Sequence, residues 1–426
     1  MKDPAETSPS ATSLAADDAR RRVEAALTAP PGSPSAHVVV PTSGSTGEPR
    51  RVQVSGSALR ASGTATAARL GGHGSWLLAL PTTHVAGLQV VARSVLAGTA
   101  PVVLDLGPRF SGRAFAAAAD RLDGARRCTS LVPTQVHRLL AEARDGDPAG
   151  LVALASFDAV LLGGAATPAP VLAELRAAGA RVVTTYGMSE TAGGCVYDGR
   201  PLDGVTVRVV DGRVQISGPV LADGYLDDPA ATAAAFVKGS PDVSTPDLTG
   251  SVDGGAAGAA GAGVVPSRGP VRGPGAQASP GSEPGRWFRT SDLGELAPDG
   301  TLTVLGRADD VVISGGVNVA PAAVEAVLVG LPAVAEVCVV GVPDPEWGEV
   351  VVAVVTLVPG STDVSQDTLL AQARSQVTDI LGAPAAPRHV VVTDALALRG
   401  PGKVDRRAVA LLAARRLGRP TSTSDR

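Results

Sequence analysis

Apolar and polar positions in the first half of the chain follow two alternating patterns. Short apolar runs that favour strands recur at residues 75–80, 101–106, 129–132, 159–162 and 181–185. Segments rich in Ala, Leu and Arg with helical spacing, such as residues 57–70, separate these runs. This alternation is typical of βαβ units and predicts a largely parallel sheet, in which ligands bind beyond the carboxyl ends of the strands.

After Gly204 the pattern changes to shorter strands joined by tight turns. One hairpin is predicted around Asp211-Gly212 and another around Asp299-Gly300. A second unit begins near residue 309, with helices at Pro321 and 368–377 and strands at 335–342, 349–357 and 388–393. We therefore expect an α/β fold: a large N-terminal domain of βαβ units with added β-hairpins, and a small mobile α+β C-terminal domain.

Composition along the chain predicts the segment boundaries. Residues 1–36 are rich in Ala, Ser and Pro, with one helical patch, and we expect a poorly ordered N-terminus. The large domain would cover residues 37–308 and the small domain residues 309–426. Residues 239–285 form a Gly/Ala/Pro/Ser tract with almost no large apolar side chains, so we expect a disordered insertion there.

Overall composition excludes several classes of protein. The 426 residues are 44% hydrophobic with a net charge of -4, which is typical of a globular protein with no electrostatic attraction to nucleic acid. We find neither a signal-peptide core nor an apolar run of membrane-spanning length, so a cytoplasmic protein is expected. Cys128, Cys195 and Cys338 lie far apart, without the spacing of a zinc site or a disulfide framework.

Lysine is scarce in this chain. Among 37 basic residues the lysines are Lys2, Lys238 and Lys403, so most basic positions carry Arg. A Lys ammonium is a compact charge on a flexible stem and does not exchange freely with the planar Arg fork at a reacting centre. Lys403 follows the turn-rich sequence Arg399-Gly400-Pro401-Gly402, and a lysine on such a loop can be carried into a site and out again.

The loop Thr42-Ser43-Gly44-Ser45-Thr46-Gly47 is a candidate for phosphate binding. Its glycines allow backbone N–H groups to converge on an anion, and its hydroxyls, with Arg50 and Arg51, add donors and positive charge. It is not a Walker loop, because no Lys precedes the last hydroxyl. An ordinary Gly/Ser turn has a similar composition, so the loop alone leaves both interpretations open.

Three further segments with candidate chemistry fall at expected strand ends. The run Gly163-Gly164-Ala165 offers bare backbone to a flat ring, and the run Tyr186-Gly187-Met188-Ser189-Glu190-Thr191 offers an aromatic face, hydroxyls and a carboxylate. Helical spacing places His84, Gly87 and Leu88 on one face, where the His could line a pocket, although a structural His is commoner. Arg93, nine positions after His84, should face away from that pocket.

The order of five motifs resembles that of the adenylate-forming superfamily of acyl-CoA synthetases, peptide-synthetase adenylation domains and luciferases. The motifs are TSGSTGEPR, YGMSET, FRTSDLG, GRADDVVISGGVNV and GPGKVDRR. Within it, PTTHVAGLQV, LVPTQVHRLL and YGMSETAGGCVYDGRPLDGV look most like the actinobacterial o-succinylbenzoate-CoA ligases of menaquinone synthesis. The resemblance implies an AMP-forming acid-thiol ligase that uses ATP, Mg²⁺ and coenzyme A.

The resemblance also implies roles for individual residues. Lys403 would stabilise the charge that develops as the substrate carboxylate attacks the α-phosphorus of ATP, with His84 as a second catalytic residue. Asp292 and Arg307 would bind the ribose, Glu190 with Thr46 would hold Mg²⁺, and His84, Gly87 and Leu88 would contact the acid. The remaining nucleotide-binding residues would be Thr42, Ser43, Gly44, Ser45, Thr46, Gly47, Gly163, Gly164, Ala165, Tyr186, Gly187, Met188, Ser189 and Thr191.

A second half-reaction with CoA is implied by the same resemblance. The small domain would rotate about the hinge residue Asp309, and Gly315, Gly316 and Asn318 would line the CoA channel. The expected partners are a small carboxylic acid, ATP and CoA, without nucleic acid or a membrane span, and a homodimer is compatible with the sequence. Three alternatives stay open: a ligase for another aryl or alkyl acid, an enzyme that loads a carrier protein, and a nucleotide-binding regulator without catalysis.

Overall fold

A seven-stranded sheet forms the centre of the large N-terminal part, in the order β4-β3-β5-β6-β7-β8-β9. Its strands are β3 (Ser75–Leu78), β4 (Val102–Val103), β5 (Arg127–Leu131), β6 (Ala159–Gly163), β7 (Val182–Met188), β8 (Gly193–Tyr197) and β9 (Arg200–Pro201). The first five strands are parallel, and β8 and β9 add antiparallel pairs at one edge. The computed structural model describes residues 10–30, 33–42, 50–107, 110–239, 271–272, 285–358, 360–361, 364–399 and 403–419.

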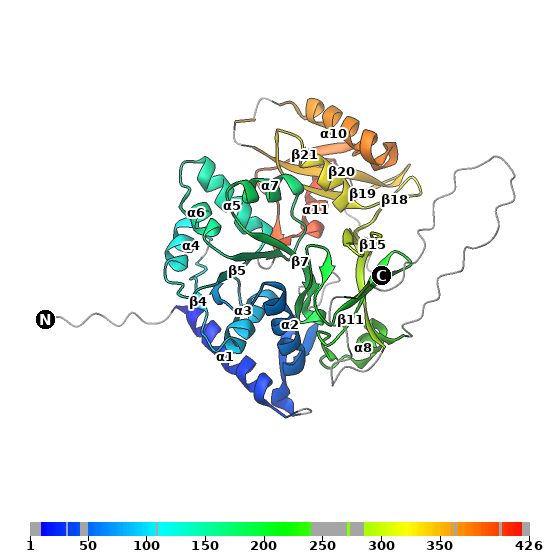
Figure 1. Ribbon diagram of the computed structural model, residues 1–426. Helices are drawn as coiled ribbons and strands as arrows, with labels where there is room; N and C mark the ends of the chain where they lie inside the picture. The colour runs from blue at the N-terminus through cyan, green and yellow to red at the C-terminus, as the bar shows by residue number, and fades with distance from the viewer. Residues whose placement is uncertain are drawn as a thin grey trace.

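Helices cover both faces of this sheet (Figure 1). One face packs against α1 (Ala11–Thr28), α2 (Gly56–Arg69) and α3 (Val85–Leu96), and the other against α4 (Gly112–Ala119), α5 (Pro133–Arg144), α6 (Ala149–Ala155) and α7 (Ala169–Ala177). Side chains alternate between the two faces: Trp76 and Leu78 belong to the first core, and Leu77 belongs to the second. Because both faces are buried, the strands are mostly apolar, as is typical of a parallel sheet. The buried Thr129 of β5 satisfies its hydroxyl by donating to the Leu77 carbonyl at 3.1 Å.

The expected poorly ordered start is wrong for the described part of the N-terminus. Ser10 caps α1 by accepting a hydrogen bond from the Ser13 backbone N–H, and the helix continues to Thr28. Ala16, Ala19, Val23 and Ala26 form a stripe at helical spacing and are at most 5% exposed. Small side chains let α1 approach α3 closely, so an Ala-rich composition here produces packing and not disorder.

Two antiparallel sheets extend the large part beyond the βαβ units. The first, β1 (His37–Pro41), β2 (Arg51–Ser55) and β12 (Gly224–Tyr225), contains the hairpin that encloses residues 43–49. The second is built from β10 (Thr206–Val210), β11 (Arg213–Ser217), β13 (Phe236–Lys238), β14 (Val271–Arg272), β15 (Arg286–Leu296) and β16 (Leu302–Arg307), with α8 (Pro229–Ala235) beside it. The hairpins predicted around Asp211-Gly212 and Asp299-Gly300 are therefore both present.

Most of the tract expected to be a disordered insertion lies outside the described residues. Its two ends are joined, since the Gly239 backbone N–H donates to the Gly285 carbonyl at 2.7 Å. Val271 and Arg272 are described and pair with β10 as the short strand β14. At these two residues the tract forms part of the sheet, which differs from the expected disorder.

The C-terminal unit has its own sheet and its own core (Figure 1). Strands β17 (Val312–Ser314), β18 (Val317–Val319), β19 (Val334–Asp344), β20 (Gly348–Leu357) and β21 (His389–Val392) pack against α9 (Pro321–Leu328) and α10 (Gln366–Leu381) on one face and α11 (Arg406–Arg416) on the other. A hairpin of β22 (Leu398–Arg399) and β23 (Lys403–Val404) precedes α11. The expected α/β fold with a large N-terminal and a small C-terminal domain is confirmed, while the division at residue 309 and the mobility of the small domain stay predictions.

The three cysteines, all within the described residues, form no disulfide. Cys128, Cys195 and Cys338 are free and buried, and burial raises the pKa of the Cys128 thiol to about 11. Among the described residues, no helix is both long and apolar enough to cross a membrane.

We expect α1 to be essential for stability. Replacing Val23, which is fully buried, with Asp places a carboxylate without a partner in the core, at a cost of about 2 kcal/mol or more. Leu14→Asp is the matched control, because Leu14 lies on the same helix and is 55% exposed. Thermal unfolding should show a large loss for the Val23 variant and almost none for the control; equal melting temperatures would contradict the packing of α1.

Candidate active site

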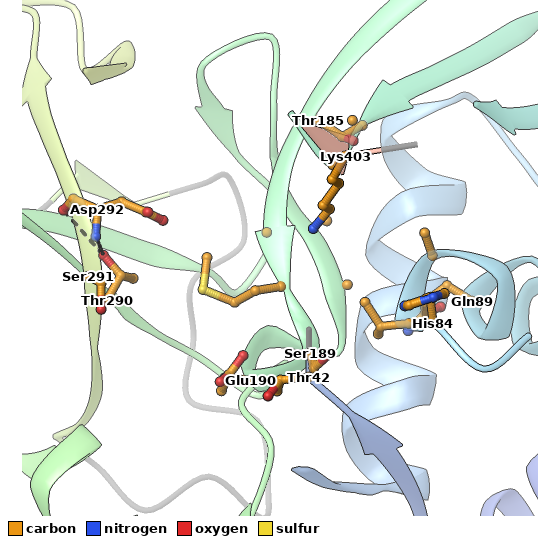
Figure 2. A pocket seen from close by; sticks show the side chains of 18 of the residues that line it. Thr42, His84, Gln89, Thr185, Ser189, Glu190, Thr290, Ser291, Asp292 and Lys403 are labelled. Atoms are coloured by element: carbon orange, nitrogen blue, oxygen red, sulfur yellow. Dashed lines mark hydrogen bonds between the residues drawn. The ribbon is translucent and has the colours of Figure 1, made fainter. Parts of the chain in front are cut away.

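A cavity of about 630 Å³ lies at the carboxyl ends of β5, β6 and β7. Strand β15 and the β22–β23 hairpin contribute to its wall, and Figure 2 shows Lys403, His84, Thr42 and Glu190 around it. The residues singled out from the sequence that line the cavity are Thr42, Arg50, His84, Arg93, Gly163, Gly164, Gly187, Met188, Ser189, Glu190, Asp292, Arg307, Asp309 and Lys403. Side chains from distant parts of the chain thus meet at the edge where parallel sheets bind ligands.

Positive charge is concentrated in this cavity. Among the described residues its lining includes seven Arg or Lys and three Asp or Glu, although the whole chain has a net charge of -4. A cleft lined mainly by one sign of charge attracts ligands of the opposite sign. The cavity is therefore suited to a polyanion such as a nucleotide triphosphate.

Several residues singled out from the sequence do not line the cavity. Gly87 packs so closely on the segment after β3 that a Cβ there would lie 2.3 Å from the Pro81 carbonyl oxygen, and Leu88 is 1% exposed in the core. The expected contact of Gly87 and Leu88 with the acid is therefore not seen. The others that do not line the cavity are Ala165, Tyr186, Thr191, Gly315, Gly316 and Asn318, while residues 43–47 lie outside the described residues.

Asp292 is held in place by its neighbours on two strands. The Tyr186 hydroxyl donates to Asp292 Oδ2 at 2.7 Å, and Arg307 stands opposite Asp292 in the β15–β16 ladder. Burial raises the pKa of the Asp292 carboxyl, while Tyr186 and Arg307 act in the opposite direction. A carboxylate fixed in this way can accept hydrogen bonds from a pair of ligand hydroxyls. Tyr186, which does not itself line the cavity, thus orients the Asp292 carboxylate.

Glu190 lies in the turn after β7 and faces the cavity. Its Oε1 accepts a hydrogen bond from the Tyr225 hydroxyl at 3.0 Å, and Arg50 lies over the Tyr225 ring. Burial raises the pKa of the Glu190 carboxyl, and this hydrogen bond opposes the shift. A hard cation would favour the ionised carboxylate, and one carboxylate with phosphate and water oxygens fits Mg²⁺ better than an all-protein cage does. The described residues contain no group of three or more His, Cys, Asp and Glu suited to a metal.

Lys403 and His84 influence each other electrostatically across the cavity (Figure 2). Burial lowers the pKa of the Lys403 ammonium first, and Arg399 and Arg307 lower it further. Burial, followed by the charge of Lys403, lowers the pKa of the His84 imidazole, so His84 is neutral at neutral pH. Lys403 also approaches Gly164, whose φ of +86° and absent Cβ suit a close passage. Lys403 thus extends from the C-terminal unit to the end of β6 in the large part.

The expectation that Arg93 faces away from the pocket is wrong. His84 has φ −108° and ψ 148°, which is extended, and α3 begins only at Val85, so helical spacing cannot be counted from His84. Val85, Gln89 and Arg93, spaced four residues apart within the helix, all line the cavity. Locating the helix N-terminus one residue later would have revealed this stripe.

Arg93 is a buried cation without a carboxylate partner among the described residues. It is 5% exposed, donates from Nη2 to the Tyr197 hydroxyl at 3.2 Å, and lies 5.0 Å from the centre of the Trp76 ring. Its Nε has no hydrogen-bond partner in the described part of the chain. Burying an unpaired charge is costly, so a ligand anion that reaches Arg93 would gain much of its binding energy there.

Comparison with known proteins agrees with this site. Residues 2–226 match the family model described as AMP-binding enzyme, and residues 323–403 match that of the AMP-binding enzyme C-terminal domain. The chain is 42% identical over 375 residues to the probable 2-succinylbenzoate-CoA ligase of Mycobacterium tuberculosis, covering 87% of this chain and 83% of that protein. It is 31% identical over 364 residues to the 2-succinylbenzoate-CoA ligase of Bacillus velezensis, covering 79% and 61%.

A solved structure is similar over most of the chain. The o-succinylbenzoate CoA synthetase of Bacillus subtilis in complex with its acyl-adenylate intermediate has a TM-score of 0.64 and 27% identity, covering 87% of this chain and 68% of that one. The chain therefore belongs to the AMP-binding enzymes, as the five motifs predicted. Within this family it is similar to the 2-succinylbenzoate-CoA ligases.

We expect the amine of Lys403 to lose its proton at a lower pH than an ordinary lysine, whose pKa is about 10.4. Because the neutral amine is the reactive form, acylation of Lys403 followed by mass spectrometry should reach half its maximum at lower pH in the folded protein than in the denatured protein. Saturating ATP should reduce the labelling. A folded midpoint at or above the denatured one would contradict the lowered pKa.

Proposed function

We propose that this protein is an ATP-dependent ligase that converts 2-succinylbenzoate to its CoA thioester through an acyl-adenylate. The observation that carries this proposal is the composition of the cavity wall. Lys403, Asp292 and Arg307, which suit a nucleotide, line the same cavity as Arg93, a buried cation of α3 that suits an acid. The similar ligases and the similar structure with an acyl-adenylate support the same reaction. Because ATP and CoA are cytoplasmic metabolites, we propose that the enzyme acts in the cytoplasm.

In the first half-reaction, a carboxylate oxygen of the acid attacks the α-phosphorus of ATP. The bond between the α-phosphorus and its bridging oxygen breaks, and pyrophosphate leaves with the bonding electrons. Lys403 would stabilise the charge on the α-phosphate and on the bridging oxygen. The ribose hydroxyls would bind Asp292 and Arg307, and the glycines Gly163 and Gly164 would leave room for the flat adenine ring.

Glu190 and Thr46 would hold Mg²⁺, which would neutralise phosphate charge during this step. Thr42 lies at the base of the loop that would bind the β- and γ-phosphates, where its backbone N–H donates to the Arg50 carbonyl at 2.7 Å. His84 lines the cavity at the start of α3, the helix that carries Arg93, and its lowered pKa favours the neutral imidazole. A neutral His84 would orient the reacting carboxylate by a hydrogen bond and leave the charge stabilisation to Lys403.

In the second half-reaction, the CoA sulfur attacks the acyl carbon, AMP leaves, and the thiol proton passes to solvent. The β17–β18 hairpin, with Gly315 and Gly316 at φ +57° and +81°, does not line the cavity in this structure. Rotation of the small unit about Asp309 would withdraw Lys403 and bring Gly315, Gly316 and Asn318 to the site. In hinge motions of this kind, a few residues at the ends of helices or strands absorb the change in φ and ψ.

A second carboxylate distinguishes 2-succinylbenzoate from most acids of this enzyme class. The ring carboxylate stays ionised after the succinyl carboxylate is activated, so it needs a cationic partner away from Lys403. Arg93 is such a cation, and the Tyr197 hydroxyl and the Trp76 ring hold its guanidinium in place. An Arg with fixed orientation is suited to bidentate recognition of a carboxylate. We propose that Arg93 selects the dicarboxylate.

Lys403→Ala should separate the two half-reactions. The variant loses charge stabilisation in adenylation, so its pyrophosphate release with 2-succinylbenzoate should fall about 10²- to 10³-fold. Thioester formation from a supplied acyl-adenylate should be nearly unchanged. No pyrophosphate release by the wild-type enzyme would refute the proposed function, while equal loss in both half-reactions would refute only the role of Lys403.

Arg93→Gln should abolish discrimination between acids. The matched substrate is 3-benzoylpropionate, which is 2-succinylbenzoate without the ring carboxylate. A lost hydrogen-bonded charge contact lowers kcat/KM for 2-succinylbenzoate about 10- to 100-fold, and the value for 3-benzoylpropionate should change little. Arg93→Lys keeps the charge without the fork and should recover part of the preference. Equal losses for both acids would assign Arg93 a purely structural role.

A further inference from the structure

Arg399 and Lys403 project from the same face of one short hairpin. They are direct partners in the antiparallel β22–β23 ladder, and directly opposite residues in such a ladder share a face. Both residues line the cavity, so that face is the one turned toward the site. The neighbouring pair on the hairpin, Leu398 and Val404, does not line the cavity.

Two like charges directly opposite each other on a sheet repel. Accordingly, the charge of Arg399 is the largest cause, after burial, of the lowered pKa of the Lys403 ammonium. An anion bound between the two side chains would convert this repulsion into attraction. Because both cations are on one hairpin, they would reach and leave such an anion together.

We propose that Arg399 is a second catalytic cation of the adenylation step, which binds the phosphate chain of ATP beside Lys403. This inference rests on the proposed function and adds a residue to it. A planar guanidinium can form two parallel hydrogen bonds to phosphate oxygens, whereas Lys403 acts as a point charge. The acid has its own buried cation in Arg93, and the triphosphate carries more negative charge than one carboxylate, so phosphate is the better match for Arg399.

Binding by Arg399 has a consequence for product release. The bond that breaks lies between the α-phosphorus and the bridging oxygen, and the negative charge grows on the leaving pyrophosphate. A cation on the hairpin that touches the phosphate chain stabilises this charge during the step. When the hairpin withdraws, pyrophosphate loses a binding partner, so the same residue favours both cleavage and release.

The test compares Arg399→Gln, Arg399→Lys and the control Arg407→Gln in the full-length enzyme. Arg407 is exposed, lies on α11 four residues after Lys403, and does not line the cavity. The measurements are kcat and KM for ATP and for 2-succinylbenzoate in pyrophosphate release, the inhibition constant of pyrophosphate, and thioester formation from supplied acyl-adenylate.

We expect Arg399→Gln to lower kcat/KM for ATP about 10- to 100-fold and to weaken pyrophosphate inhibition, as loss of charged hydrogen bonds predicts. Its KM for the acid and its thioester formation should match the wild type, which also shows that the variant is folded. Arg399→Lys should lie between the two, and Arg407→Gln should match the wild type.

Three results would overturn the inference. Unchanged ATP kinetics and pyrophosphate inhibition in Arg399→Gln would exclude contact with phosphate. A raised KM for the acid alone would assign Arg399 to the carboxylate. Equal loss in both half-reactions would assign it a structural role. Each of these leaves wild-type pyrophosphate release intact, so they differ from a failure of the proposed function itself.

Discussion

Concentrated positive charge in a partly buried cavity is the constraint on which this site depends. Burial disfavours the charged form of Lys403, and its cationic neighbours disfavour it further. Asp292 and Glu190 act in the opposite direction, and a polyanionic ligand would add counter-charge that stabilises the ammonium further. Arg93 also lies buried without a carboxylate partner among the described residues, so a bound anion would compensate its charge as well. The free enzyme therefore carries an electrostatic cost that bound nucleotide and acid relieve.

The fold delivers these charges to one place by simple geometry. Parallel strands end at a common edge, and both faces of the sheet are covered by helices, so that edge is the accessible part of the sheet. Asp292 comes from β15 of a separate antiparallel sheet, and Lys403 comes from the C-terminal unit. The large N-terminal part thus supplies most of the cavity wall, and the β22–β23 hairpin of the C-terminal unit supplies Lys403.

How much the sequence predicted depended on whether the signal was local. The five parallel strands and the two hairpins were foreseen because apolar runs and Asp-Gly turns are local patterns. A helical patch was foreseen within residues 1–36, but the packing of α1 was not, because its core face is mostly Ala, whose burial depends on how close α3 comes. Arg93 was misplaced because His84 is extended, a backbone fact that spacing alone does not reveal. The partners of Asp292 and Glu190 were not foreseen, since Tyr186 and Tyr225 reach them from other elements.

The contacts around the junction of the two units bear on how Lys403 could move. Arg307, at the end of β16 in the large part, pairs with Asp309 at 3.1 Å. The next residue, Asp310, pairs instead with Arg406 of α11 at 3.2 Å, and Arg406 is bound bidentately to Glu325 of α9. Two adjacent carboxylates are thus held by opposite units. Rotation about the backbone between them would leave both ion pairs intact, whereas rotation elsewhere in this segment would break one. Since Arg406 lies three residues after Lys403, the lysine would move with Asp310, which supports a hinge at Asp309.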